Sequence, residues 1–269
     1  MWQRVKEKLS RPTDSPTRAR IADSRPLVPV ETTVYDAFPS FAAMHNIARS
    51  SYPDIRETFF WEIFERYKPY TCLSVERFYD IFKSMEYIAC SDIPGDMLEC
   101  GVFLGGSIIG AAHFANHFGM KGRKFHIFDT FEGFPIETIE TDLHGATQDL
   151  SALKVFNNSF RHIVERNIAS SGLDAEQFVL IQGKVEDTLK RDHQVDQAAY
   201  LRLDTDYFDS TLVELEVLYP KLSQGGVLIV DDYGHFEGAR AAVEKYFEHS
   251  KRRPLLHRID YTGRSGIKI

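Results

Sequence analysis

The chain has 269 residues, of which 43% are hydrophobic and 26% charged, and its formal net charge is −7 at pH 7. This composition is typical of a globular protein with one large or two small domains, and it excludes a mainly disordered chain. The net negative charge argues against a general nucleic-acid-binding protein, because such proteins neutralise phosphates with clustered Lys and Arg.

The sequence also lacks the features of a membrane or secreted protein. No apolar stretch approaches the roughly 20 residues that cross a bilayer, and the N-terminal segment MWQRVKEKLSRP lacks the apolar core of a signal peptide. Cys72, Cys90 and Cys100 have no metal-binding spacing, and an odd number of cysteines suits a reducing compartment. We therefore expect a soluble, cytoplasmic protein without a membrane partner.

Residues 1–30 differ from the rest of the chain in charge. They contain four prolines and seven basic residues against three acids, so this segment carries +4 and the remainder carries −11. A basic, Pro-rich start is typical of a flexible arm. The alternative is a strap that orders over a partner subunit or a substrate.

Residues 31–93 have the rhythm of amphipathic helices. Apolar side chains recur at three- and four-residue steps in two groups: Phe59, Phe60, Ile63, Phe64 and Tyr67, then Val75, Phe78, Phe82 and Met85. Such stripes predict helices that pack on a larger body. The pair Pro94-Gly95 ends this pattern, so we predict a helical cap at 31–93 and a second domain at 94–269.

From residue 96 onward, short β-rich runs alternate with helical stretches. The predicted strands are residues 97–100, 124–129, 178–182, 200–204, 226–231, 255–260 and 266–269. The predicted helices between them are residues 105–118, 152–171, 186–191, 209–222 and 237–250. This alternation predicts an α/β fold with a mainly parallel sheet and helices on both faces. The tight turn at 262–265 requires an antiparallel hairpin at the end, which gives seven strands.

In such sheets, ligands bind outside the C-terminal ends of the strands. The first strand is followed by a Gly-rich turn, with Gly101, Gly105 and Ser107, that leads into a helix. Glycines let a ligand approach the backbone, and the start of a helix offers unpaired N–H groups. The spacing G-x-x-x-G-G departs from the G-x-G-x-x-G of dinucleotide-binding folds, which weakens a nicotinamide interpretation. A simple strand-to-helix connection remains the alternative.

The next two strands also end in acids. Asp129 can accept hydrogen bonds from both hydroxyls of a ribose, or it can cap the local backbone. Glu186 and Asp187 follow the third strand, where an adenine amine or a helix N-terminus could use them.

The fourth and fifth strands deliver four aspartates to one rim, namely Asp204, Asp206, Asp231 and Asp232. Their mutual repulsion in a partly dry cleft calls for a cation. Mg²⁺ fits better than zinc, because oxygen ligands suit a hard ion and no His or Cys is near in sequence. The alternative is a pair of helix caps made by Asp206 and Asp232.

Three stretches resemble the macrocin O-methyltransferase family. They are PGDMLECGVFLGGS at 94–107, FDTFEGFP at 128–135 and LRLDTDYFDSTLVELEVLYPKLSQGGVLIVDDYG at 201–234. TCLSVERF at 71–78 is similar to the N-terminal helix of that family. The resemblance covers about residues 70–250 and implies a class I methyltransferase fold. It further implies a Mg²⁺-dependent enzyme that uses S-adenosylmethionine to methylate sugar hydroxyls in antibiotic biosynthesis.

The resemblance also implies roles for individual residues. Gly101, Gly105 and Ser107 would border the methionine part of the cofactor, and Asp129 would hold its ribose. Glu99, Glu186 and Asp187 are further candidates for cofactor binding. Asp204, Asp231 and Asp232 would ligate Mg²⁺, and Asp206 would be the general base.

The chemistry of methyl transfer agrees with these roles. A sugar hydroxyl is nearly fully protonated at neutral pH, so it needs a metal ion to acidify it and a base to take its proton. A small sugar-like acceptor with vicinal hydroxyls fits both needs. Two other interpretations remain: a nicotinamide-dependent oxidoreductase, and a catalytically inactive scaffold of the same fold. The apolar N-terminal helices and the resemblance both suggest a homodimer.

Overall fold

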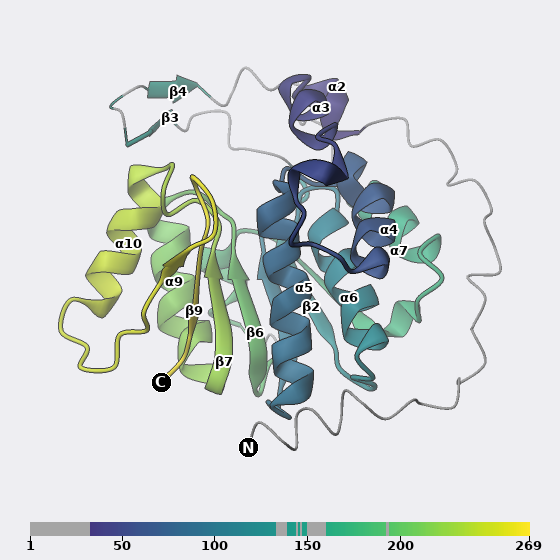
Figure 1. The fold of residues 1–269 in the computed structure, drawn as a ribbon. Coiled ribbons are helices and arrows are strands. Elements are labelled where there is room, and N and C mark those ends of the chain that lie inside the picture. The colour runs from purple at the N-terminus through teal and green to yellow at the C-terminus, as the bar shows by residue number, and fades with distance from the viewer. Residues whose placement is uncertain (1–32, 133–138, 144, 146, 150–159, 192–193) are drawn as a thin grey trace. The chain divides into compact units, whose positions relative to one another are not determined.

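The structure is a computed structural model of the chain (Figure 1). It describes residues 33–132, 139–143, 145, 147–149, 160–191 and 194–269. Residues 33–269 form one compact unit. The predicted arm at 1–30 and the first part of the predicted helix 152–171 lie outside the described residues.

Seven strands form one sheet in the order β5-β2-β1-β6-β7-β9-β8. Their bounds are β1 Asp96–Cys100, β2 Phe125–Asp129, β5 Phe178–Gln182, β6 Ala198–Leu203, β7 Leu222–Val230, β8 His257–Arg258 and β9 Arg264–Ile267. The five neighbouring strands β5, β2, β1, β6 and β7 are parallel, while β9 is antiparallel to both β7 and β8. The predicted α/β fold with a C-terminal antiparallel hairpin is confirmed.

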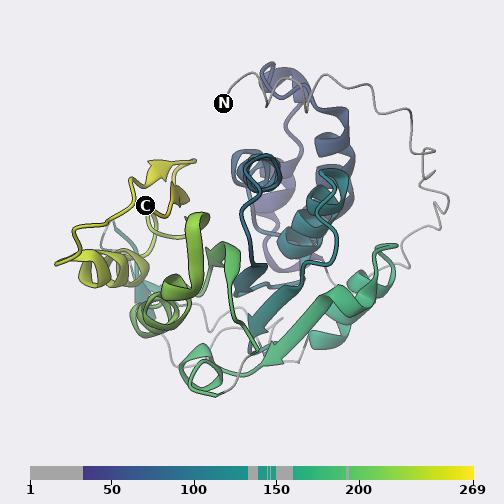
Figure 2. The ribbon, with the colours of Figure 1, turned by 90° about the horizontal axis from the view of Figure 1, so that it is seen from below.

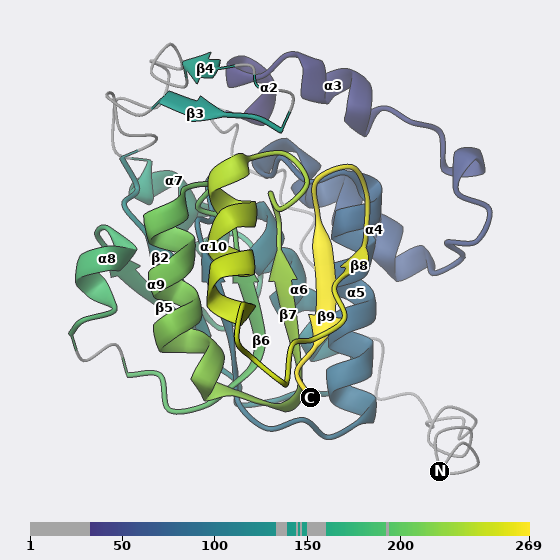
Figure 3. The same cartoon turned by 90° about the vertical axis from the view of Figure 1, so that its left-hand side faces the viewer.

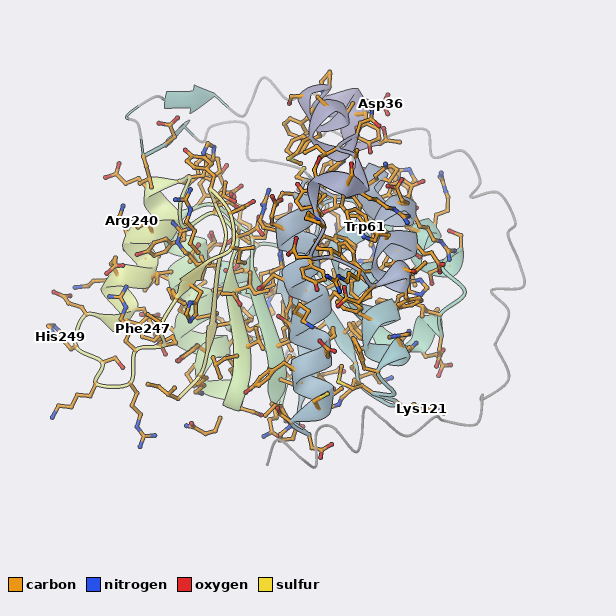
Figure 4. All side chains as sticks on the ribbon, viewed as in Figure 1. Asp36, Trp61, Lys121, Arg240, Phe247 and His249 are labelled. Carbon is orange, nitrogen blue, oxygen red and sulfur yellow. The ribbon has the colours of Figure 1, made fainter. Side chains whose placement is uncertain are left out.

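Helices cover both faces of this sheet (Figure 2). On one side lie α4 Thr58–Tyr67, α5 Val75–Cys90, α6 Gly106–His117 and α7 Arg161–Ala169. On the other side lie α8 Val185–Thr188, α9 Phe208–Leu218 and α10 Glu237–Phe247. Trp61 of α4 and Phe247 of α10 mark the two layers in Figure 4, and both are buried.

The N-terminal helices pack on the sheet domain through the predicted apolar stripes. Ser74 starts α5 as a cap, its hydroxyl accepting a hydrogen bond from the Arg77 backbone N–H at 3.2 Å. Phe78 lies directly against Gly110 of α6, where a Cβ would come within 2.5 Å of the Phe78 ring. This close approach ties α5 to the sheet domain within one compact unit, and the domain boundary at 93/94 stays an interpretation of the sequence.

Alternation along the strands decides which side chains face which helices. Leu98 and Cys100 of β1 and Leu203 of β6 belong to the apolar cluster that includes α8, α9 and α10. Glu99 and Arg202, which are register partners in β1 and β6, therefore face the α5 side. A buried pair of opposite charges thus lies beneath the C-terminal ends of the central strands.

Several short elements were not predicted. They are α2 Val34–Ala37, α3 Ser40–His45, the strand pair β3 Ile139–Thr141 and β4 Thr147–Asp149, and 3-10 turns at Arg49–Ser51, Lys68–Tyr70, Ala175–Gln177 and Tyr219–Lys221. Helices of four and six residues are too short to show a helical period, and β3 and β4 are mostly polar. In Figure 3, α2, α3, β3 and β4 lie beyond one end of the parallel strands.

Some predicted boundaries were wrong. The strand predicted at 255–260 is only His257–Arg258, and β9 begins at Arg264, inside the predicted turn. The helix predicted at 186–191 is a single turn, Val185–Thr188. None of the helices in the described part of the chain is long and apolar enough to cross a membrane.

Candidate active site

A cavity of about 1010 Å³ lies at the C-terminal ends of the parallel strands. The loops after β1, β2, β5, β6 and β7 all contribute to its wall, together with α3 and the turn between β8 and β9. The chain order reverses between β1 and β6, which is where open α/β sheets bind ligands. Ligand pockets typically span about 300–1,000 Å³, so this cavity has room for a cofactor and a second molecule.

The turn after β1 brings two of its three predicted residues to the cavity. Gly101 and Ser107 line the wall. Gly101 has φ +78°, and a Cβ there would lie 2.0 Å from the Asp204 carbonyl oxygen, so only glycine fits. Gly105, with φ +84°, faces Val164 of α7 and Ile109 instead.

Asp129, at the end of β2, ties two loops together and also lines the cavity. Its Oδ2 accepts hydrogen bonds from the backbone N–H groups of Val102 at 2.7 Å and Phe103 at 3.3 Å, and its Oδ1 accepts one from Phe131 at 2.7 Å. Burial raises the pKa of Asp129, although these three donors oppose the rise. The backbone-capping alternative is therefore present, while the ribose role stays a prediction.

Of the remaining predicted cofactor residues, Glu186 lies at the cavity wall, Asp187 is exposed and Glu99 is buried. Glu186 lines the cavity, whereas Asp187, beside it in α8, is not among the lining residues. Glu99 is fully buried behind the wall, where its Oε1 accepts hydrogen bonds from Arg202 Nη1 at 2.6 Å and from the Ser107 hydroxyl. Burial raises the pKa of Glu99, and Arg202 opposes that rise.

Three of the four predicted aspartates converge. One carboxylate oxygen each of Asp204, Asp206 and Asp232 lies within 4.8 Å of the other two. The side chain of Asp232 hydrogen-bonds with both Asp204 and Asp206. Burial, with added repulsion from the neighbouring carboxylates, raises the pKa of Asp204 and of Asp232 well above the ordinary range. Arg202 is an ion-pair partner of Asp204 and opposes the rise there.

Asp231 lies beside this cluster but is held by arginines. Its Oδ2 accepts a hydrogen bond from Arg77 Nη1, and its Oδ1 lies 2.7 Å from Arg202 Nη2. The second contact lacks hydrogen-bond geometry, so Oδ1 has an ion-pair partner but no directed donor. Burial would raise the pKa of Asp231, but Arg202 and Arg77 lower it below the ordinary value.

Arg77 and Arg202 are site residues that the sequence interpretation missed. Arg202 is 1% exposed, and its Nη2 also lies 2.9 Å from Asp204 Oδ2. A charge inside the apolar run Ala198–Leu203 was a usable signal, because a buried charge needs a partner. Arg77 gave no such signal, since arginine is common on amphipathic helices. It also donates through Nε to Asp260 Oδ2 at 3.0 Å, in the turn before β9.

Aromatic residues line the cavity around these acids. Phe38 lies 6.5 Å from Phe103 between ring centroids, and Phe103 lies 6.2 Å from Phe160. On the opposite side, His235 and Tyr261 line the wall with ring centroids 5.7 Å apart. The cavity therefore combines an apolar surround with a strongly acidic floor.

Comparison with known proteins gives the chain a family. The macrocin-O-methyltransferase family matches residues 65–265. The chain is 29% identical over 238 residues to the 8-demethyl-8-(2,3-dimethoxy-alpha-L-rhamnosyl)-tetracenomycin-C 4'-O-methyltransferase of Streptomyces olivaceus, covering 87% of this chain and 84% of that protein. It is 30% identical over 199 residues to the mycinamicin III 3''-O-methyltransferase of Micromonospora griseorubida, covering 72% and 76%.

Solved structures agree. The O-methyltransferase NovP superposes with a TM-score of 0.66 at 26% identity, covering 87% of this chain and 99% of that one. The predicted class I methyltransferase fold is thereby confirmed, and the oxidoreductase and inactive-scaffold interpretations are set aside. The chain belongs to the macrocin-O-methyltransferase family and is an S-adenosylmethionine-dependent O-methyltransferase.

Proposed function

We propose that this enzyme methylates a hydroxyl of a sugar or another vicinal diol on a small secondary metabolite, with the help of a divalent cation, Mg²⁺. The convergence of Asp204, Asp206 and Asp232 inside an aromatic cavity carries this proposal. The names of two relatives support the acceptor class, because one acts on a rhamnosyl tetracenomycin and the other on mycinamicin III.

S-adenosylmethionine occupies the half of the cavity above β1, β2 and β5. Gly101 lets its methionine part approach the backbone, Ser107 lies at the start of α6, Asp129 holds the ribose, and Glu186 faces the base. Gly105 supports this half by shaping the turn after β1, and Glu99 supports it by accepting a hydrogen bond from Ser107. Asp187 lies in the first turn of α8, where its charge suits the helix N-terminus.

The residues of the other half fit a hard cation. The four aspartates lie near two arginines, Arg77 and Arg202, which also form ion pairs with Asp260 and Glu99. The carboxylates of this group therefore outnumber the arginines. Asp204, Asp231 and Asp232 are the proposed ligands, and Asp206 is the proposed base. Asp206 lies as close to Asp204 and Asp232 as a ligand would, so the roles of Asp206 and Asp231 need a direct test. When bound, Mg²⁺ supplies positive charge that lowers the pKa of an acceptor hydroxyl.

The chain's own residues then orient the acceptor and move one proton. The acceptor oxygen attacks the methyl carbon, the carbon–sulfur bond breaks, and the hydroxyl proton passes to an Asp206 carboxylate oxygen. Asp206 has φ +68°, a left-handed backbone that is unusual outside glycine. Such conformations persist where the surrounding structure holds them, often at functional sites. Alignment of the two reacting groups contributes the rest of the rate.

The test combines binding and turnover. We expect S-adenosylhomocysteine to bind by calorimetry with or without EDTA, and EDTA to abolish methyl transfer to a panel of rhamnosides with free vicinal hydroxyls. Matched deoxy-rhamnosides that lack one hydroxyl of the pair serve as the control and should react poorly. Turnover that is unchanged by EDTA would remove the cation from the proposal, and equal rates on the deoxy sugars would remove the diol.

The roles of Asp206 and Asp231 are separated by Mn²⁺ binding to the full chain. Asp231→Asn should weaken Mn²⁺ binding and Asp206→Asn should not, while both abolish turnover. The opposite pattern would exchange the two roles. The homodimer and the cytoplasmic location stay predictions, and light scattering on the purified protein tests the first of them.

A further inference from the structure

Glu214 is a buried acid that the proposed chemistry does not use. It lies in the middle of α9 and is 0% exposed, inside a stretch that otherwise packs against the sheet. Its Oε1 accepts a hydrogen bond from the Thr205 hydroxyl at 3.0 Å. Its Oε2 has no hydrogen-bond partner among the described residues. A buried polar group that is only partly hydrogen-bonded lowers the stability of the fold. Glu214 at this position therefore indicates a role that offsets this cost.

Thr205 is the residue between Asp204 and Asp206. The Asp204 backbone N–H donates to the Cys100 carbonyl oxygen at 2.9 Å, and the Tyr207 N–H donates to the Thr205 carbonyl oxygen at 2.8 Å. The hydrogen bond from Tyr207 to Thr205 encloses Asp206, so the loop turns sharply at Asp206, which has a left-handed conformation. Thr205 stands directly before this turn. The direction of both aspartates depends on how Thr205 is held.

The Thr205 side chain has a hydrogen bond that fixes its orientation. Its methyl group is near Gly101, 3.4 Å from where a Cβ on Gly101 would be, so the glycine offers no side chain to hold it. Its hydroxyl donates to Glu214 at 3.0 Å. A hydrophobic residue at 214 would leave the Thr205 hydroxyl without this acceptor.

We propose that Glu214 is a positioning residue of the carboxylate site: by holding Thr205, it fixes the loop so that Asp204 and Asp206 converge with Asp232. This inference rests on the proposed cation-dependent function. Glu214 itself touches neither the cation nor the acceptor. Its expected effect is on the affinity for the cation.

The experiment measures Mn²⁺ affinity of the full chain by electron spin resonance, S-adenosylhomocysteine affinity by calorimetry, and the melting temperature. Glu214→Leu and Thr205→Val should each weaken Mn²⁺ binding by about 10-fold, within the range seen when residues that orient metal ligands are lost. The double variant should be no weaker than the single ones, because both remove the same hydrogen bond. Glu214→Gln keeps an acceptor for Thr205 and should stay within about 3-fold of the original affinity.

Leu218→Ala is the matched control, because Leu218 is fully buried on the same helix and far along it from the loop. It should lower the melting temperature without changing Mn²⁺ affinity. If Glu214→Leu does not fold, Thr205→Val carries the test, since Thr205 is only partly buried. The inference is overturned if both variants bind Mn²⁺ as tightly as the original chain, or if Leu218→Ala loses as much affinity. If the original chain binds S-adenosylhomocysteine but no Mn²⁺, the proposed cation fails and this inference fails with it.

Discussion

The two halves of the cavity differ in how their acids are compensated. In the half above β1 and β2, Asp129 accepts three backbone hydrogen bonds, and Glu99 is held by Arg202 and Ser107. In the half above β6 and β7, Asp204, Asp206 and Asp232 lie close to one another, and Arg202 contacts Asp204. The acids of the first half are held by backbone, hydroxyl and arginine donors, whereas the second half gathers three carboxylates, which is where we propose the cation. The comparison predicts that the two halves respond to different changes.

Asp204→Asn should have the largest effect, because it removes one of the proposed ligands of the cation. We expect turnover to fall by about 10³-fold, the scale seen when one group that stabilises the transition state is lost. S-adenosylhomocysteine affinity should change by less than about 3-fold, since Asp204 belongs to the other half. Steady-state kinetics and calorimetry measure the two quantities. Asp196→Asn, an exposed acid at the opposite end of β6, is the control, and equal losses in both measurements would break the comparison.

Arg202→Met should have the next largest effect, and it acts on stability. Arg202 is the only side chain that contacts Glu99, Asp204 and Asp231 together among the described residues. Its loss leaves buried carboxylates unpaired, which costs about 3–5 kcal/mol in the free energy of unfolding. Urea denaturation measures this cost. Arg161→Met, which breaks an exposed pair with Glu165, should cost less than about 1 kcal/mol, and similar costs for both variants would contradict the network.

Asp129→Asn sharpens the comparison from the cofactor side. Hydrogen bonds to a charged group contribute about 1.5–3 kcal/mol, so we expect S-adenosylhomocysteine affinity to fall by about 10- to 100-fold. Mn²⁺ affinity should stay unchanged, because Asp129 lies outside the carboxylate cluster. Calorimetry with each ligand alone measures both. A loss of Mn²⁺ affinity equal to the loss of cofactor affinity would show that the halves are not independent.

The smallest predicted effect is a dependence of cation stabilisation on pH. The pKa of Asp204 and of Asp232 is raised in the fold, by burial first and then by neighbouring carboxylates. In the unfolded chain these groups ionise near pH 4, so above that pH the metal-free fold pays to ionise them and loses stability as pH rises. The pKa of Asp231 is lowered, so its stabilising contribution is lost only at acidic pH.

Mn²⁺ binds ionised carboxylates, and its stabilising effect should therefore grow with pH. We expect the rise in melting temperature on adding excess Mn²⁺ to be about 2–4 °C larger near pH 7.5 than near pH 5.5, which corresponds to about 1 kcal/mol for a chain of this size. Differential scanning calorimetry against an EDTA reference measures this difference. A larger rise at the acidic pH would contradict the raised pKa values.

Most of the fold was predictable because its determinants are local. The central strands are short runs rich in apolar residues, and β1, β6 and β7 are each followed by a helix of 11 or 12 residues. The positions of Gly101, Asp129 and Asp204 followed from one rule, that parallel strands present their C-terminal ends at one edge. The short elements α2 and α3 had no such pattern, because six residues or fewer cannot show a helical period.

The partners within the site were not predictable in the same way. Arg77 reaches Asp231 across 154 residues, and Arg202 meets Glu99 only because the register of β1 and β6 places them opposite each other. Glu214 reaches Thr205 because α9 packs back under the loop that precedes it. No periodic pattern in the sequence predicts these contacts.

By itself, the sequence determined which runs of residues form the strands, where the glycine-rich turn lies and that four aspartates stand at strand ends. These features depend on residues that are neighbours in the chain. The tertiary structure alone decided which acids lie beside arginines and which lie beside one another. Asp231 contacts both Arg77 and Arg202, while Asp204, which also contacts Arg202, converges with Asp206 and Asp232. Electrostatic compensation depends on distances between segments that are remote in the chain, and only folding sets those distances.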